Sequence, residues 1–179
     1  MALRILDIKQ GTSVDGPGLR DSIYFAGCEH HCEGCHNPQS WSPDGGREWD
    51  DEEIMSVLEY DDFNVTFSGG DPMFQAEGVA RLARLIKERL GKTIWCYTGY
   101  RFEQLVGQAK FMPLLEQIDV LVDGPFVMSQ RDISLRFRGS ANQRIIDVPK
   151  SLRLGSAVLV EEFMQVDYIE FFAKCGEKS

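Results

Sequence analysis

Four short apolar segments of the chain each run directly into a polar loop that contains glycine. The segments are residues 22–26, 65–67, 93–97 and 120–122, and the loops after them begin at Gly27-Cys28, Ser68-Gly69, Thr98-Gly99 and Asp123-Gly124. Helical patterns separate the later segments, as expected for strands that lie parallel in one sheet. Because parallel strands bring their carboxyl ends to one edge, where α/β proteins place their ligands, we expect these loops to form one functional face.

Helical periodicity between these segments supports an α/β fold. It predicts helices over about 51–59, capped by Asp50 or Asp51, over 79–90 with Gly91 at the end, over 101–110 and over 113–117. The 179 residues are too few for a complete barrel of about 250, so the sequence predicts a partial, open (β/α) barrel. We expect residues 1–150 to form this domain and 151–179 a C-terminal extension packed on it, in which 157–163 and 168–174 could each be helix or strand.

The first loop concentrates cysteine and histidine. It contains Cys28, Cys32 and Cys35 in a Cys-x3-Cys-x2-Cys spacing, and all three histidines of the chain, His30, His31 and His36. Three clustered thiolates can hold three irons of a [4Fe–4S] cluster and leave the fourth iron open to a small ligand, whereas four cysteines usually serve electron transfer alone. A tetrahedral zinc site of three cysteines and one histidine fits the same spacing. The loop by itself leaves both possibilities open.

The second loop, Ser68-Gly69-Gly70-Asp71-Pro72, follows the next strand of the predicted sheet. Adjacent glycines let the backbone approach a ligand closely, and Asp71 provides a carboxylate for an ammonium group. Taken alone, the segment would be an ordinary turn. Beside the cysteine loop it favours a cluster that binds a small amino-acid ligand over a structural zinc site, which needs no such companion.

Composition narrows the remaining classes of function. A net charge of −9, from 28 acidic and 19 basic residues, disfavours binding to nucleic acid. No secretory signal is visible and no segment approaches the roughly 20 apolar residues of a membrane span, so we expect no membrane partner and a cytoplasmic location. In a reducing compartment the clustered cysteines indicate metal or cluster binding rather than disulfides, and the distant Cys96 and Cys175 are expected to be buried or incidental thiols.

Together these motifs resemble the radical S-adenosylmethionine superfamily, which the Cys-x3-Cys-x2-Cys loop marks. The resembling segments keep the order of that superfamily over about residues 4–150; they are 14–20, 27–38, 66–72, 95–100, 120–126 and 138–143. Within it, Thr98-Gly99-Tyr100 and Arg138–Gln143 are more similar to the activators of anaerobic ribonucleoside-triphosphate reductases than to pyruvate formate-lyase activating enzymes.

The resemblance implies a partial barrel of the radical S-adenosylmethionine type and a role for each matching residue. Cys28, Cys32 and Cys35 would ligate three irons of the cluster. The residues implied to contact S-adenosyl-L-methionine are Gly34, Cys35, His36, Asn37, Gly69, Gly70, Asp71 and Asp123. Among them, Gly69, Gly70 and Asp71 would hold the methionine amino group, and Asp123 would lie near the ribose or the sulfonium. Asp15 would lie near the bound methionine, and no conventional catalytic side chain is implied.

The activity that the resemblance implies is reductive cleavage of S-adenosylmethionine and removal of a hydrogen from a glycine of the reductase large subunit, which makes a glycyl radical. A flavodoxin-type protein would supply the electron, and the cofactors would perform the difficult chemistry. Another glycyl-radical enzyme of the pyruvate formate-lyase type stays open as the partner. Two further classes of function stay open, a small-molecule radical enzyme such as 7-carboxy-7-deazaguanine synthase and a non-catalytic zinc module.

Three positions depart from the wider superfamily pattern. Gly34 stands where many members carry an aromatic residue, and Asp71 replaces a more widespread glutamate. Pro125 occupies a position where several activators have lysine, so a basic contact to the substrate is either missing here or supplied by Arg136 or Arg138.

Overall fold

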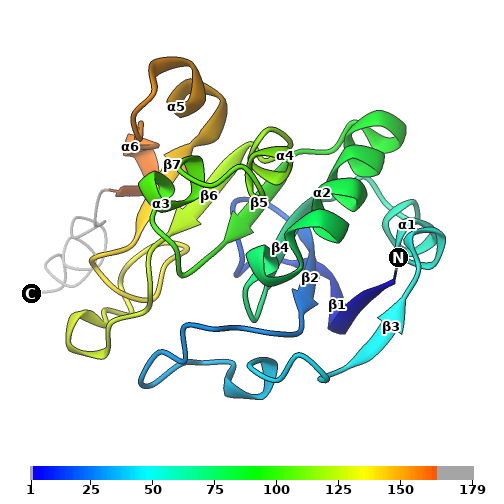
Figure 1. Cartoon of the computed structure of the whole chain (residues 1–179), viewed down its shortest axis with the longest axis horizontal. Helices are drawn as coiled ribbons and strands as arrows, with labels where there is room; N and C mark the ends of the chain where they lie inside the picture. The colour runs from blue at the N-terminus through cyan, green and yellow to red at the C-terminus, as the bar shows by residue number, and fades with distance from the viewer. Residues whose placement is uncertain (1, 165–179) are drawn as a thin grey trace, which may run out of the picture.

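The computed structural model describes residues 2–164, which build one mixed sheet of seven strands (Figure 1). The strands are β1 (Leu3–Thr12), β2 (Arg20–Phe25), β3 (Arg47–Trp49), β4 (Asn64–Gly69), β5 (Ile94–Tyr97), β6 (Val120–Asp123) and β7 (Arg144–Asp147), in the spatial order β3-β1-β2-β4-β5-β6-β7. The four central strands β2, β4, β5 and β6 are parallel, and the pairs at both sides of them are antiparallel. These central strands are the four predicted ones; β1, β3 and β7 were not predicted.

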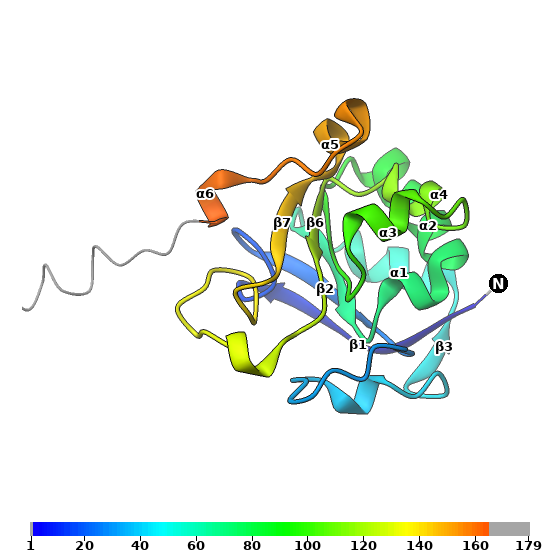
Figure 2. The same cartoon turned by 60° about the vertical axis from the view of Figure 1, so that its left-hand side comes forward.

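Helices α1–α4 lie on one side of the sheet, and loops occupy the other side (Figure 2). The helices are α1 (Asp51–Leu58), α2 (Ala76–Leu85), α3 (Phe102–Val106), α4 (Met112–Leu115), α5 (Val148–Leu154) and α6 (Glu161–Met164), and a π-helical turn, Ile86–Leu90, extends α2. The predicted cap of α1 is confirmed, because Asp50 accepts a hydrogen bond from the Glu53 amide at 2.8 Å. Gly91 ends the α2 segment in the left-handed conformation that glycine tolerates, as predicted.

Side chains alternate between the two faces of each central strand. On the helix side Ile23, Phe67, Cys96 and Leu121 belong to one buried core that includes residues of α1, α2 and α4. On the loop side Trp95, Val122 and Ile145 form a second, smaller cluster with Phe163 of α6. The sheet therefore has a filled helix face and a loop face on which a site can be built. Cys96 is a fully buried thiol, as expected.

Three of the predicted segments differ from the structure or fall outside it. The helix expected over 101–110 is shorter and ends at Val106, since Gly107 follows and the chain turns at 107–111 before α4. Residues 157–163 contribute one bridge, Leu159 to Ile146, and the start of α6. Residues 168–174 and Cys175 lie outside the described residues. None of the described helices has the length and apolar character needed to cross a membrane.

Candidate cluster site

The cysteine loop leaves the end of β2 and folds back on itself. Its base is fixed by hydrogen bonds from the Gly27 amide to the Ser40 carbonyl at 2.8 Å and from the Cys28 amide to the Trp41 carbonyl at 3.2 Å. The loop turns through left-handed backbone at His31 and Gly34, with φ angles of 45° and 72°. At Gly34 an aromatic residue would be strained, which explains the departure from the superfamily pattern. The three thiols are free and half-buried.

A cavity of about 640 Å³ opens beside these thiols, within the usual range for small-molecule sites. The loops after all four parallel strands line it, so the structure brings together the four loops that the sequence placed on one face. The predicted site residues in its wall are Cys28, Cys32, Cys35, His36, Asn37, Gly69 and Gly70, and Asp15 also lines it. Gly34, Asp71 and Asp123 are not among the lining residues.

The Gly-Gly turn after β4 is joined to the cysteine loop by backbone contacts. The Gly70 amide donates to the Phe25 carbonyl at 2.8 Å, and the Asp71 amide donates to the Gly27 carbonyl at 2.9 Å. A Cβ atom on Gly70 would lie 2.4 Å from the Gly27 carbonyl oxygen, far closer than any side chain tolerates. Glycine at this position therefore allows the two loops to meet at one wall of the cavity.

Asp71 is buried and connects three strand-end loops. Its Oδ2 accepts hydrogen bonds from Thr98 Oγ1 at 2.9 Å and the Gly99 amide at 3.1 Å, and lies 2.7 Å from His30 Nε2. Its Oδ1 accepts from the Met73 amide at 2.9 Å. The carboxylate is thus already surrounded by protein donors, and it holds His30 of the cysteine loop against the loop after β5.

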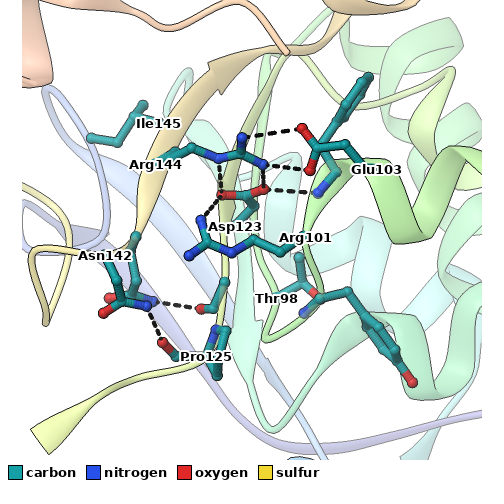
Figure 3. Close-up of polar contacts among 12 residues, drawn as sticks. Thr98, Arg101, Glu103, Asp123, Pro125, Asn142, Arg144 and Ile145 are labelled. Atoms are coloured by element: carbon teal, nitrogen blue, oxygen red, sulfur yellow. Dashed lines mark hydrogen bonds and ion pairs between the residues drawn. The ribbon is translucent and has the colours of Figure 1, made fainter. Parts of the chain in front are cut away.

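Asp123 shares the helix side of the sheet with Leu121 and does not line the cavity; its polar contacts are with residues of α3 and β7 and with Arg101 (Figure 3). Its carboxylate forms a two-pronged ion pair with Arg144 of β7, at 3.0 and 2.5 Å, and accepts from the Phe102 amide at the start of α3 at 2.8 Å. Arg101 lies 3.8 Å away, and Arg144 also pairs with Glu103. The structure therefore gives Asp123 a role in fixing α3 to β6 and β7, and its expected contact with a ligand stays a prediction.

The remaining candidates from the sequence lie in different places. Asp15 accepts a hydrogen bond from the Tyr24 hydroxyl at the cavity wall, where burial raises the pKa of Tyr24 above its usual range. Pro125 is not at this cavity, and its carbonyl accepts from the Asn142 side chain at 2.8 Å. Arg138 lines the cavity, whereas the Arg136 guanidinium lies over the Phe137 ring.

Sequence reasoning missed several wall residues that have no motif of their own. Tyr24 and Tyr97 line the cavity from β2 and β5, and Phe126, Phe137 and Gln143 line it from the loop between β6 and β7. The two tyrosines could have been found from strand alternation, because Ser22 and Tyr24, like Trp95 and Tyr97, lie two residues apart on one face. The loop residues carry no comparable periodic signal.

The donor set at the cavity suits a cluster held by three cysteines. Among the residues that the structure describes, no fourth cysteine lines the cavity, and no three His, Cys, Asp or Glu side chains are grouped as they would be around a single metal ion. A [4Fe–4S] cluster does not require its ligands to surround a single ion, since each thiolate binds a different iron. Burial raises the pKa of the Cys28 and Cys32 thiols, so binding of iron must displace their protons.

Comparison with known proteins decides between the two kinds of site. A family model described as a 4Fe-4S single cluster domain matches residues 14–146. The anaerobic ribonucleoside-triphosphate reductase-activating protein of Vibrio cholerae is 40% identical over 141 residues, which is 74% of this chain and 90% of that protein. The protein of the same name from Haemophilus influenzae is 39% identical over 141 residues, with the same two coverages. The chain belongs to this family of activating proteins.

Membership in the activating-protein family resolves the choice that the loop spacing left open, in favour of a [4Fe–4S] cluster over zinc. A solved structure, QueE from Escherichia coli, aligns with 55% of this chain and 53% of its own at 18% identity and a TM-score of 0.48, an overlap too slight to argue from. The cluster-domain match ends at residue 146, so it does not include helices α5 and α6 of this activating protein.

Proposed function

We propose that this chain activates an anaerobic ribonucleoside-triphosphate reductase by reductive cleavage of S-adenosylmethionine, which leads to a glycyl radical on the reductase large subunit. The observation that carries the proposal is the meeting of three half-buried thiols with the Gly69-Gly70 turn at one cavity. The family of the chain supports the same partner, because relatives at 40 and 39% identity are named as activating proteins of an anaerobic ribonucleoside-triphosphate reductase.

Within this proposal each part of the site has a separate task. Cys28, Cys32 and Cys35 hold the cluster, which when bound passes an electron to adenosylmethionine and so enables hydrogen removal from a peptide glycine. The residues that we propose to line the bound adenosylmethionine are Gly34, Cys35, His36, Asn37, Gly69, Gly70, Asp71 and Asp123. The cavity walls exclude water from the reacting groups and set their orientation.

The two carboxylates in this set are occupied by protein donors before any ligand arrives. For Asp71, a methionine ammonium group would replace one of the three donors at Oδ2, and His30 is the candidate because it belongs to the loop that would hold the cluster. For Asp123 to bind a ligand group in place of its protein partner, its ion pair with Arg144 would have to break. We therefore expect Asp71 to contribute more directly to ligand binding than Asp123.

We further propose that the sheet is a partial, open barrel whose mouth admits a glycine-bearing loop of the reductase. The exposed apolar side chain of Val14 at the cavity supports this, because a polypeptide substrate needs apolar surface to dock on. The proposal also includes a flavodoxin-type protein as the electron donor and a cytoplasmic location. It divides the chain into a domain of residues 1–150 and a C-terminal extension of residues 151–179.

The decisive experiment is anaerobic incubation of the reconstituted protein with the reductase, adenosylmethionine and a reductant, followed by electron paramagnetic resonance. We expect a glycyl-radical signal that disappears when Cys32 is replaced by alanine. A pyruvate formate-lyase type enzyme in place of the reductase is the matched specificity control. A protein with full cluster content that yields no radical on the reductase would refute the assignment of the partner.

A further inference from the structure

The chain that leaves β6 lies against the cysteine loop on either side of its third cysteine. We call this segment, residues 124–128, the strap. A Cβ on Gly34 would lie 2.9 Å from the Met128 sulfur, so the thioether packs on the backbone of the cysteine loop. On the other side of the third cysteine, the Phe126 ring lies 5.2 Å from the His36 ring. Two side chains of the strap thus contact the cysteine loop directly, although the strap contains no ligand of the proposed cluster.

The strap also provides a backbone donor to one of the thiols. The Cys35 thiol accepts a hydrogen bond from the Asn37 amide at 3.3 Å, a donor within the cysteine loop itself. The Cys32 thiol has a donor from outside that loop. Burial raises the pKa of Cys32, and the Phe126 amide, hydrogen-bonded to its sulfur, opposes the rise. Because hydrogen bonds to the sulfurs help to set the reduction potential of an iron–sulfur cluster, the position of the strap bears on the redox chemistry of the site.

Hydrogen bonds hold the strap to residues 138–143, one of the segments that resemble the reductase activators. We call residues 138–143 the supporting turn. The Asn142 side chain donates to the Pro125 carbonyl at 2.8 Å (Figure 3). The Val127 amide donates to the hydroxyl of Ser140, a fully buried residue, at 3.1 Å. Side chains of the supporting turn therefore bind the main chain of the strap at more than one position.

Gln143 joins the supporting turn to the start of the strap through both ends of its amide. Its Oε1 accepts hydrogen bonds from the Gly139 and Ser140 amides at 2.9 and 3.2 Å. Its Nε2 donates to the Gly124 carbonyl at 3.1 Å. Gly124 has a φ angle of 97°, which glycine tolerates, so this bond fixes the strap where the chain turns out of β6. The two ends require an acceptor and a donor, which an amide has and a carboxylate lacks.

We propose that Gln143 is a positioning residue, which acts through the strap to keep the Phe126 amide on the Cys32 sulfur and so helps to set the reduction potential and the retention of the cluster. The inference rests on the proposed function in one respect, that the three cysteines hold the cluster. It goes beyond that function because it gives a redox role to a residue that binds no iron, and a task to the supporting turn.

Two substitutions test the bond between Gln143 and the strap. Q143E keeps an acceptor oxygen for the supporting turn but puts a second oxygen where the amide donated to the Gly124 carbonyl. Q143L removes the same donor without adding a charge. Both should lower the midpoint potential of the reconstituted cluster, because the reduced cluster carries one more negative charge for the Phe126 amide to stabilise. Anaerobic redox titration followed by electron paramagnetic resonance measures this potential.

Q130E is the matched control. Gln130 lies just past the strap and is exposed, and within the described part of the chain only its backbone forms hydrogen bonds. The same change from amide to carboxylate should therefore leave the potential at the wild-type value.

Retention of the cluster is a second readout that does not depend on turnover. Both Gln143 variants should lose iron to a chelator about fivefold faster than wild type, the factor that corresponds to one hydrogen bond. M128A should also lose iron faster, because it removes the packing on Gly34, and M128L should return the rate toward that of wild type. Met128 is half exposed, so these two variants leave the folded core intact.

The outcomes separate the claims. A wild-type protein that takes up no iron and sulfide on reconstitution would overturn the proposed function itself. An unchanged or higher potential in both Gln143 variants would overturn the role of Gln143. A lower potential in Q143E alone would do the same, because the new charge would then act directly. Equal rates of iron loss from M128A and wild type would overturn the role of the strap in retention, even where a Gln143 variant fails to fold.

Discussion

Replacing Asp123 with asparagine separates support of the fold from contact with the ligand. The amide side chain would keep the shape of the carboxylate and one acceptor oxygen for the Phe102 amide, but it would lose the charge that Arg144 binds. If Asp123 mainly fixes α3 to β6 and β7, the variant should be less stable yet bind adenosylmethionine normally. If Asp123 mainly contacts the ligand, the affinity should fall instead.

The size of the stability loss follows from the burial of the pair. Breaking a buried ion pair by removing one partner costs about 3–5 kcal/mol. Arg144 retains Glu103 as a second partner and its side chain is 26% exposed, so we expect a loss somewhat below this range, about 2–3 kcal/mol. For a chain of this size that corresponds to a melting temperature lower by about 4–12 °C.

Chemical denaturation of D123N, R144Q and the double variant measures this directly. Because both single changes break the same pair, the losses should not add, and the double variant should be little worse than D123N. Equilibrium dialysis on the folded proteins supplies the second readout. A D123N protein as stable as wild type but unable to bind adenosylmethionine would refute the structural role and restore the ligand contact.

Three further changes probe other parts of the structure. Alanine at Cys28, Cys32 or Cys35 should abolish the [4Fe–4S] content, seen as loss of iron, acid-labile sulfide and visible absorption; full cluster content in any one of them would contradict its assignment as a ligand. Gly99→Ala would place a Cβ 2.3 Å from the His30 ring, so we expect the cysteine loop to be displaced and the cluster to be held more weakly. The rate of iron loss to a chelator measures this, and the control variant Gly107→Ala should retain iron normally. Burial raises the pKa of Asp21 to about 6, so the charged form of Asp21 opposes folding above that pH. From about pH 5 to about pH 8, wild type should therefore lose about 1–2 kcal/mol of unfolding free energy relative to D21N. If denaturation of the two proteins gives parallel pH profiles, this effect of Asp21 is excluded.

The parallel centre of the sheet was predictable because each of its strands contains a short, mainly apolar run with a glycine close after it. Residues 94–96 of β5, for example, are buried on both faces of the sheet, and the resulting apolar run can be recognised without knowing which strands lie beside it. β1 was missed since polar residues interrupt it and it pairs through irregular register with β2. β3 and β7 are short, and their strand conformation depends on pairing with β1 and β6.

The two carboxylates of the site show what sequence alone could not decide. Asp71 and Asp123 both follow an apolar strand and precede a loop of the active face, so the sequence places them alike. In the structure Asp71 lies past the end of β4 and joins the loops around the cavity, whereas Asp123 is still the last residue of β6. Strand alternation then puts Asp123 on the side of Leu121, and Val122 between them faces the cavity side.

That single-residue difference changes what each carboxylate can do. A group beyond the strand end is free to meet residues from several loops, and Asp71 contacts the loops that carry His30 and Thr98. A group within the strand is restricted to one face, and Asp123 is restricted to the face that α3 covers. The two carboxylates thus stabilise different parts of the fold: Asp71 joins the loops around the cavity, and Asp123 fixes α3 to β6 and β7.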